Sequence, residues 1–258
     1  ITANRSNIQA LGTGGQATAI GGVGGDGFGG TVTIRAIDGL ISYTDGINSS
    51  IIRANGAAGR TSEDNSIGGT GQGGTINISA SGVNGAISFA NFSFGARANG
   101  FGGPNGDAES GFGANAQGGS GLGGAINVDI SDGASLTVGG TGPAIFDATG
   151  IGGLSEGIDS TGGSATGGSV QVVVSNGASV NLGTQELRLT ANAVAGNART
   201  GGVGGNAAAA SSSLLVDNGS LSTAGRLAIF ANAEGGSGGV NGGNGNGGQV
   251  SLTSINGG

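Results

Sequence analysis

The side chains that most often perform catalysis are scarce in this sequence. It has 258 residues with no Cys and no His, and its eight basic residues are all Arg. A Ser-His, Cys-His or Ser-Lys pair is therefore excluded, and so is a Schiff-base lysine. Two carboxylate pairs remain as candidates for acid and base work, Glu63 with Asp64 and Asp107 with Glu109. Both lie in glycine-rich stretches, where solvated surface charge is expected, so no catalytic residue and no enzyme activity are predicted.

Metal and cofactor sites are equally poorly supported. The stretch 21–28 partly matches the glycine-rich nonapeptide of calcium-binding β-rolls, with Asp26 as its carboxylate. No carboxylate occupies the matching place in 68–74 or 242–248, so the repeated calcium ligand is missing. Scattered Gly-x-Gly-x-x-Gly matches follow from composition and do not indicate nucleotide binding. No cofactor and no metal ion are predicted.

Composition restricts the partners. Glycine accounts for 65 residues, only 9% of the chain is charged, and the net charge is −7. Negative charge opposes attraction to phosphate backbones, so no nucleic-acid partner is expected. No apolar run reaches the roughly 18 residues of a membrane-spanning helix, so no span is expected.

An Asn-Gly or Asp-Gly dipeptide recurs at intervals of roughly 40 to 50 residues, which is typical of a repeat protein. Glycine is expected to supply the positive φ of each corner. The corner residues are Asp38-Gly39, Asn84-Gly85, Asp132-Gly133, Asn176-Gly177, Asn218-Gly219 and Asn256-Gly257.

Before each corner, apolar and polar residues alternate with the period of a half-buried strand. These first strands are predicted at 31–36, 75–80, 125–130, 169–174, 212–217 and 249–254, with inward pairs such as Val32 and Ile34 or Val250 and Leu252. A second strand follows each of the first five corners, at 40–44, 86–90, 134–138, 178–182 and 220–224.

A third strand is predicted in five repeats, at 51–55, 94–99, 144–149, 187–192 and 227–232. Its inward positions compensate in size between repeats, since Phe94 accompanies Ala96 while Ala144 accompanies Phe146. Its outward positions place Arg97 beside Asp147, which favours a weak ion pair. Its last two residues form a strand-end ladder: Ala54 and Asn55, Ala98 and Asn99, Ala148 and Thr149, Ala191 and Asn192, Ala231 and Asn232.

Glycine-rich excursions separate the third strand from the next first strand, at 12–30, 56–74, 100–124, 150–168, 195–210 and 235–248. They are either a flexible fringe or extended strands that stack between repeats. Their similar lengths and the Gly-Gly pairs that close most of them favour stacking, because flexible linkers vary freely in length.

Short strands in register cannot bury their apolar faces alone, but stacked repeats share a core. The predicted fold is all-β, a parallel β-solenoid of about six coils, with a stack height of about 29 Å. One array is expected over 1–258, with repeats at about 8–48, 49–91, 92–140, 141–184, 185–225 and 226–258. Because the chain begins at Ile1 and stops just after a turn, we expect an excerpt of a longer array.

The segments 176–189 and 218–229, the latter reading NGSLSTAGRLAI, resemble coils of the filamentous-haemagglutinin-like and autotransporter passenger adhesins of Gram-negative bacteria. This resemblance implies a right-handed parallel β-helix that is exported to the cell surface as a stalk, fibre or adhesin. Short parts of the excursions resemble the polyglycine bundles of some antifreeze proteins and phage fibre tips.

The expected function is therefore that of a structural, extracellular or cell-surface repeat protein that forms a stalk, fibre or sheath and takes part in adhesion. Its expected partners are further copies of itself, through stacking or lateral assembly, and surface glycans of a host or the environment. The alternatives are a surface-binding module for glycan or ice, and a phage-type fibre. A polysaccharide-degrading β-helix enzyme is the least favoured, because it would need a cleft with clustered Arg and carboxylates.

Overall fold

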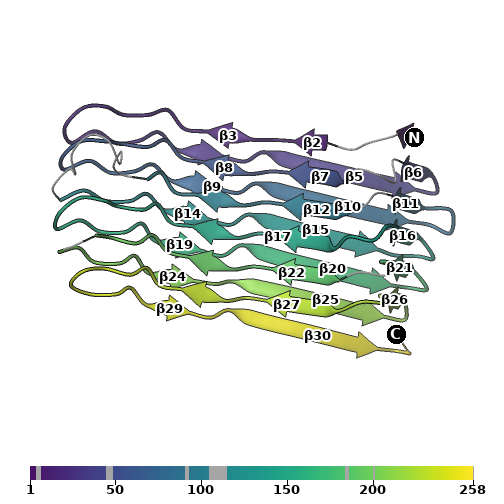
Figure 1. Cartoon of the computed structure of the whole chain (residues 1–258). Helices are drawn as coiled ribbons and strands as arrows, with labels where there is room; N and C mark the ends of the chain where they lie inside the picture. The colour runs from purple at the N-terminus through teal and green to yellow at the C-terminus, as the bar shows by residue number, and fades with distance from the viewer. Residues whose placement is uncertain are drawn as a thin grey trace.

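The computed structural model describes residues 1–3, 7–44, 49–90, 93–104, 115–183, 186–199 and 201–257. Within these ranges the chain is entirely β, with strands in five six-stranded parallel sheets and no helix. Successive coils stack from the purple N-terminal coil to the yellow C-terminal one (Figure 1). The predicted parallel β-solenoid is confirmed.

The first predicted strands form the longest sheet, which we call the long sheet. Its strands pair in register, with Thr75 between Thr31 and Ala125, and side chains alternate between core and solvent. In chain order they are β5 (Thr31–Ile37), β10 (Thr75–Ser81), β15 (Ala125–Ile130), β20 (Ser169–Ser175), β25 (Ser211–Asp217) and β30 (Gln249–Ile255).

The second and third predicted strands form two further sheets, each of which also contains one strand near the N-terminus that was not predicted. The short sheet contains β1 (Thr2–Ala3), β6 (Leu40–Tyr43), β11 (Ala86–Phe89), β16 (Ser135–Val138), β21 (Ser179–Asn181) and β26 (Ser220–Ser222). The middle sheet contains β2 (Asn7–Gln9), β7 (Ser50–Arg53), β12 (Phe94–Arg97), β17 (Ala144–Asp147), β22 (Leu187–Thr190) and β27 (Leu227–Phe230).

The glycine-rich excursions add two sheets of two-residue strands, although in the last two coils the outgoing strand lies just before the predicted start of the excursion. The outgoing strands are β3 (Gly12–Thr13), β8 (Gly56–Ala57), β13 (Gly100–Phe101), β18 (Gly150–Ile151), β23 (Ala193–Val194) and β28 (Ala233–Glu234). The returning strands are β4 (Gly27–Phe28), β9 (Gly71–Gln72), β14 (Gly121–Leu122), β19 (Ala165–Thr166), β24 (Ala207–Ala208) and β29 (Gly245–Asn246). We call the stacked excursions the fin. Stacking, rather than a flexible fringe, is therefore confirmed for the described residues.

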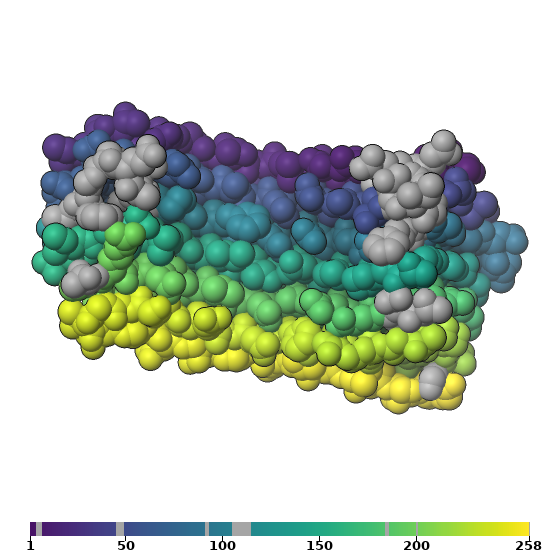
Figure 2. All heavy atoms as spheres, viewed as in Figure 1, coloured from purple at the N-terminus to yellow at the C-terminus, as the bar shows by residue number. Residues whose placement is uncertain are grey.

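Each coil is a flat loop in which the fin continues the core sideways. The chain leaves the middle sheet through an outgoing strand, turns at the fin tip, and returns to the long sheet, while the short sheet closes the opposite edge. Figure 2 shows the coils as parallel bands across the whole width of one face.

The core lies between the long, short and middle sheets. Ile52, Ala96 and Phe146 are buried on successive coils of the middle sheet. The Phe94 and Phe146 rings pack with centroids 5.5 Å apart, and Phe89 packs 4.5 Å from Phe94. The predicted exchange of large and small residues between coils is thus how this core keeps its volume.

The last coil departs from one prediction. Val250 and Leu252 do lie on the inward side of β30, in register with Ser212 and Leu214. They are nevertheless 53% and 61% exposed, because within the described residues no short- or middle-sheet strand follows β30 to cover them. The apolar interior is therefore open at this end of the stack.

Candidate functional surfaces

The corner turns join the long sheet to the short sheet, as predicted, but glycine is not the main source of the positive φ. The acidic or amide residue adopts it at Asp38, Asp132, Asn176, Asn218 and Asn256, with φ between 45° and 56°. Asn and Asp tolerate this left-handed region because of their short polar side chains. Among the corner glycines, only Gly133, Gly177 and Gly257 also have a positive φ. The prediction that glycine supplies the positive φ was therefore wrong for Gly39, Gly85 and Gly219.

The second corner is displaced along the chain. Gly82, with φ of 81°, takes the left-handed conformation, while Asn84 and Gly85 follow it with negative φ. A Cβ atom on Gly82 would lie 2.1 Å from Oδ1 of Asp38 on the preceding coil. Glycine is thus required here by conformation, whereas the contact could be relieved by movement of the Asp38 side chain.

Hydrogen bonds connect corners on neighbouring coils. Nδ2 of Asn176 donates to Oδ1 of Asp132 over 3.1 Å, and Nδ2 of Asn256 donates to Oδ1 of Asp217 over 2.6 Å. The corner residues therefore hold coils in register, and no ligand needs to be invoked to account for their polar groups.

The alanines of the strand-end ladder mark the place where the core narrows into the fin. Their carbonyl groups accept hydrogen bonds from glycines that precede long-sheet strands: Gly74 to Ala54 (2.6 Å), Gly124 to Ala98 (2.7 Å), Gly168 to Ala148 (2.7 Å) and Gly248 to Ala231 (2.8 Å). The long and middle sheets approach so closely here that a Cβ atom on Gly29 would lie 2.2 Å from the Ala54 carbonyl oxygen. Ala191 is also fully buried at this junction.

The second ladder position links coils through side chains. Oδ1 of Asn55 accepts from the backbone N–H of Asn99, and Oδ1 of Asn99 accepts from that of Thr149, both over 3.0 Å. Further along the stack, Oδ1 of Asn192 accepts from the N–H of Asn232 over 2.9 Å. The ladder is thus a structural seam of the stack.

A zigzag of hydrogen bonds connects the two legs of the fin through every coil. The N–H of Gly59 donates to Gly25 (2.8 Å), Gly69 donates to Gly59 (3.2 Å), and Gly103 donates to Gly69 (3.0 Å). The pattern continues with distances of 2.8–3.0 Å to Gly243. The twelve residues of this glycine zigzag are Gly15, Gly25, Gly59, Gly69, Gly103, Gly119, Gly153, Gly163, Gly196, Gly205, Gly236 and Gly243.

Contact distance explains why the zigzag consists of glycine. None of its twelve residues has a positive φ. A Cβ atom on Gly119 would lie 1.9 Å from the Gly69 carbonyl oxygen, and one on Gly163 would lie 2.0 Å from that of Gly119. At eleven of the twelve positions backbone therefore packs directly on backbone and leaves no room for a side chain, whereas a Cβ atom on Gly15 in the first coil would have no atom of the described residues within 4 Å.

Tight turns at the fin tip were not predicted from the sequence. Asn65, Asn115 and Asp159 have φ values of 53–56° on three successive coils. In the first and fifth coils a glycine, Gly21 or Gly201, adopts the positive φ instead. The recurrence of an Asn or Asp in the middle of excursions of similar length was the available signal.

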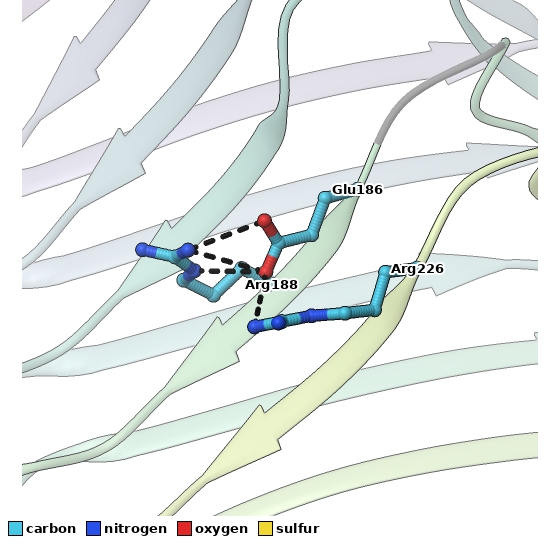
Figure 3. A network of polar contacts seen from close by, with 3 residues as sticks. All are labelled: Glu186, Arg188 and Arg226. Carbon is cyan, nitrogen blue, oxygen red and sulfur yellow. Dashed lines mark hydrogen bonds and ion pairs between the residues drawn. The ribbon is translucent and has the colours of Figure 1, made fainter.

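A charged cluster lies on the middle-sheet face of the last coils. Arg188 on β22 and Arg226 just before β27 both contact Oε1 of Glu186, at 3.2 Å and 3.1 Å (Figure 3). The hydrogen bond and charge of Arg188, together with Arg226, hold the pKa of Glu186 below its usual range, although partial desolvation opposes this. The cluster therefore connects two coils electrostatically.

A hollow of about 300 Å³ lies where the middle sheet meets the outgoing leg of the fin. Arg53 and Arg97 line it from adjacent strands in register, with Leu11 and Phe101 nearby. The predicted Arg97–Asp147 ion pair is wrong, although the two residues do lie opposite each other. Asp147 is instead held by Nδ2 of Asn99 at 3.0 Å and by the Thr149 hydroxyl at 2.5 Å.

The remaining candidate sites offer no reactive arrangement. Glu63 and Asp64 belong to the second fin tip, while Asp107 and Glu109 lie outside the described residues. Oδ1 of Asp26 accepts from the N–H of Thr70 over 2.7 Å and so serves the coil pairing. Within the described ranges, no three Asp or Glu residues gather as a metal site, and no helix could span a membrane.

Comparison with known proteins gives no assignment. No family model, no curated protein and no solved structure matches this chain.

Proposed function

We propose that this chain is a structural repeat segment that serves outside the cell, or on its surface, as part of a stalk, fibre or sheath. The observation that supports this most directly is that hydrogen bonding between coils is continuous across both core and fin. A stack held together over its whole width resists bending, which suits a mechanical role better than a role that needs a mobile loop.

The two ends of the stack favour growth by addition of coils. Within the described residues, the N–H of Gly15 in the first coil donates no hydrogen bond, and the carbonyl of Gly243 in the last coil accepts none. In this part of the chain, the N–H of Gly15 is the free donor at one end of the glycine zigzag, and the carbonyl of Gly243 is the free acceptor at its other end. A further coil, from this chain or from another copy, would pair with either end, since unpaired edges are templates for additional strands.

Electron microscopy of the material isolated from its source tests this proposal. Filaments with an axial reflection near about 4.8 Å are expected if coils stack along the fibre. Monomers at every concentration in analytical ultracentrifugation, together with an absence of filaments, would refute assembly. Immunogold labelling of intact cells tests the surface location, and labelling confined to the cell interior would refute it.

Surface binding is a second candidate function, favoured by the hollow around Arg53 and Arg97. Ice binding is not favoured, because the outward row that begins with Thr31 and Thr75 is interrupted by Ala125. We propose no catalytic role.

A further inference from the structure

The hollow around Arg53 and Arg97 combines positive charge with an open shape on an acidic protein. It lies along the junction between the middle sheet and the fin, and Leu11, Asn55 and Phe101 complete its main lining. The chain as a whole carries a net charge of −7, so two adjacent cations form a local exception.

Within the described part of the chain, neither guanidinium group of this hollow has an anionic partner. Arg53 and Arg97 are register partners on β7 and β12, and paired strands lie about 4.8 Å apart. Like charges at opposed positions destabilise a sheet. The nearest carboxylate in register, that of Asp147, is engaged by Asn99 and Thr149.

We propose that this hollow binds an acidic polysaccharide, with Arg53 and Arg97 contacting the carboxylate or sulfate groups along one strand of the polymer. A guanidinium group can form paired hydrogen bonds with a planar carboxylate and also binds sulfate. The amide of Asn55 supplies a polar group for hydroxyls, while Leu11 and Phe101 supply apolar surface for a sugar ring.

The placement of the hollow suits a linear polymer rather than a compact ligand. A second hollow, lined by Arg188, Thr190, Asn192, Phe230 and Asn232, lies further along the stack. Thr190 and Phe230 continue the register row of Arg53 and Arg97, while Arg188 lies two residues earlier on β22. Both hollows belong to one face, so a polymer that runs along the stacking direction would meet both. Between them it would pass Asp147, whose carboxylate is bonded by Asn99 and Thr149. The first hollow is the primary site, because Arg188 in the second is already paired with Glu186.

This inference rests on the surface-binding part of the proposed function and does not depend on filament formation. Electron microscopy of the same samples measures filament formation, so a failure of assembly can be distinguished from a failure of polymer binding.

Isothermal titration calorimetry with three size-fractionated polymers tests the inference: polygalacturonate, dextran sulfate and neutral dextran. The wild-type protein should bind at least one charged polymer, more weakly as salt rises, and should not bind dextran. The two charged polymers distinguish carboxylate from sulfate recognition. The double variant Arg53→Gln/Arg97→Gln should bind at least tenfold more weakly, with each single variant intermediate.

Arg35→Gln is the matched control, because Arg35 is an exposed arginine on the long-sheet face with no ion pair in the described part of the chain. Its binding should equal that of wild type. The proposal would be overturned if the double variant bound as tightly as wild type, or if Arg35→Gln lost as much affinity as the double variant. It would also be overturned if wild type bound dextran as tightly as the charged polymers, or bound neither charged polymer.

A second measurement uses the unmodified sequence, so that it does not depend on how the variants fold. Phenylglyoxal labelling of arginine, read by peptide mass spectrometry, should slow at Arg53 and Arg97 when the bound polymer is present and should stay unchanged at Arg35. Unchanged labelling at Arg53 and Arg97 would contradict the assigned site. Protection by an acidic peptide, but by neither charged polymer, would assign the hollow to a protein partner and overturn it as well.

Discussion

At the scale of single residues, glycine has two separate roles in this chain. At Gly82 it permits a left-handed backbone, whereas along the glycine zigzag it permits two backbones to touch. At every zigzag position except Gly15 the second role tolerates no Cβ atom, because the nearest atoms are backbone atoms on neighbouring legs and not the ends of flexible side chains.

Gly119→Ala should therefore destabilise the protein by about 1–3 kcal/mol, the usual cost of forcing an extra methyl group into a packed interior. The measurement is the shift of the thermal unfolding midpoint by circular dichroism. Gly95→Ala is the control, since no atom lies within 4 Å of its Cβ position on β12. That substitution should be neutral or slightly stabilising, and equal effects of both changes would contradict the proposed contact.

The charge on Glu186 should make a small, pH-dependent contribution to stability. Since its pKa is lowered in the folded protein, the contribution is fully present above the ordinary carboxyl pKa and is lost as the pH falls through the lowered value. Its partners Arg188 and Arg226 are 41% and 65% exposed, so solvent screening keeps it below about 1 kcal/mol.

Wild type and Glu186→Gln should therefore differ in unfolding midpoint at neutral pH and converge under acidic conditions. The control Glu234→Gln changes the charge of a residue for which the structure records no ion pair within its described part. If the difference in unfolding midpoint between wild type and Glu186→Gln grew as the pH falls, the predicted direction of the pH dependence would be contradicted.

At the scale of the elements, the core depends on aromatic residues that fit between coils. Phe146 is buried on β17 against Phe94, whereas Phe28 on β4 is 59% exposed. Phe146→Ala should cost about 3–5 kcal/mol, while Phe28→Ala should change stability by no more than about 0.5 kcal/mol. Thermal unfolding of both variants measures this contrast. A similar loss of stability in the two variants would show that Phe146 does not belong to the core.

The sequence predicted the three core strands because their side chains alternate and the alternation recurs in every repeat. The inward rows, the strand-end ladder and all corner positions but the second, which is displaced to Gly82, followed from that pattern. The two legs of the fin could be predicted only as stacked segments, because glycine carries no side-chain period that distinguishes strand, turn and register. The αL turns at Asn65, Asn115 and Asp159 were missed although a recurring Asn or Asp in the middle of the excursions could have indicated them.

The Arg53–Arg97 hollow could not be predicted either. Its residues come from three coils and two sheets, and its charge depends on the direction in which Asp147 turns. Strand register alone suggested an ion pair there, which shows that residues opposite each other in a sheet need not interact when closer polar partners compete.

At the scale of the whole molecule, the open face of the last coil controls assembly if coils add end to end. Leu252 is exposed there on the inward side of β30. Leu252→Lys should leave the single chain folded, because the side chain has no cover to lose, and should reduce filament length in electron microscopy, because an inward charge on an edge strand blocks pairing.

Ile158→Lys supplies the control, since Ile158 is 59% exposed in the fin of an interior coil, between β18 and β19, and lies on neither edge strand of the long sheet. It should leave assembly at the last coil unchanged. Filaments of wild-type length from Leu252→Lys would show that growth does not proceed through this end.

The glycine-rich fin should be as ordered as the core, because its amides bond from coil to coil. Hydrogen exchange followed by mass spectrometry measures this order on the interior coils. The amides of Gly119, Gly153 and Gly163 each donate over 2.8 Å to the carbonyl of the preceding glycine of the zigzag. They should exchange as slowly as amides of β15 and β20, whereas exchange at the rate of an unstructured chain, with those strands still protected, would contradict the account.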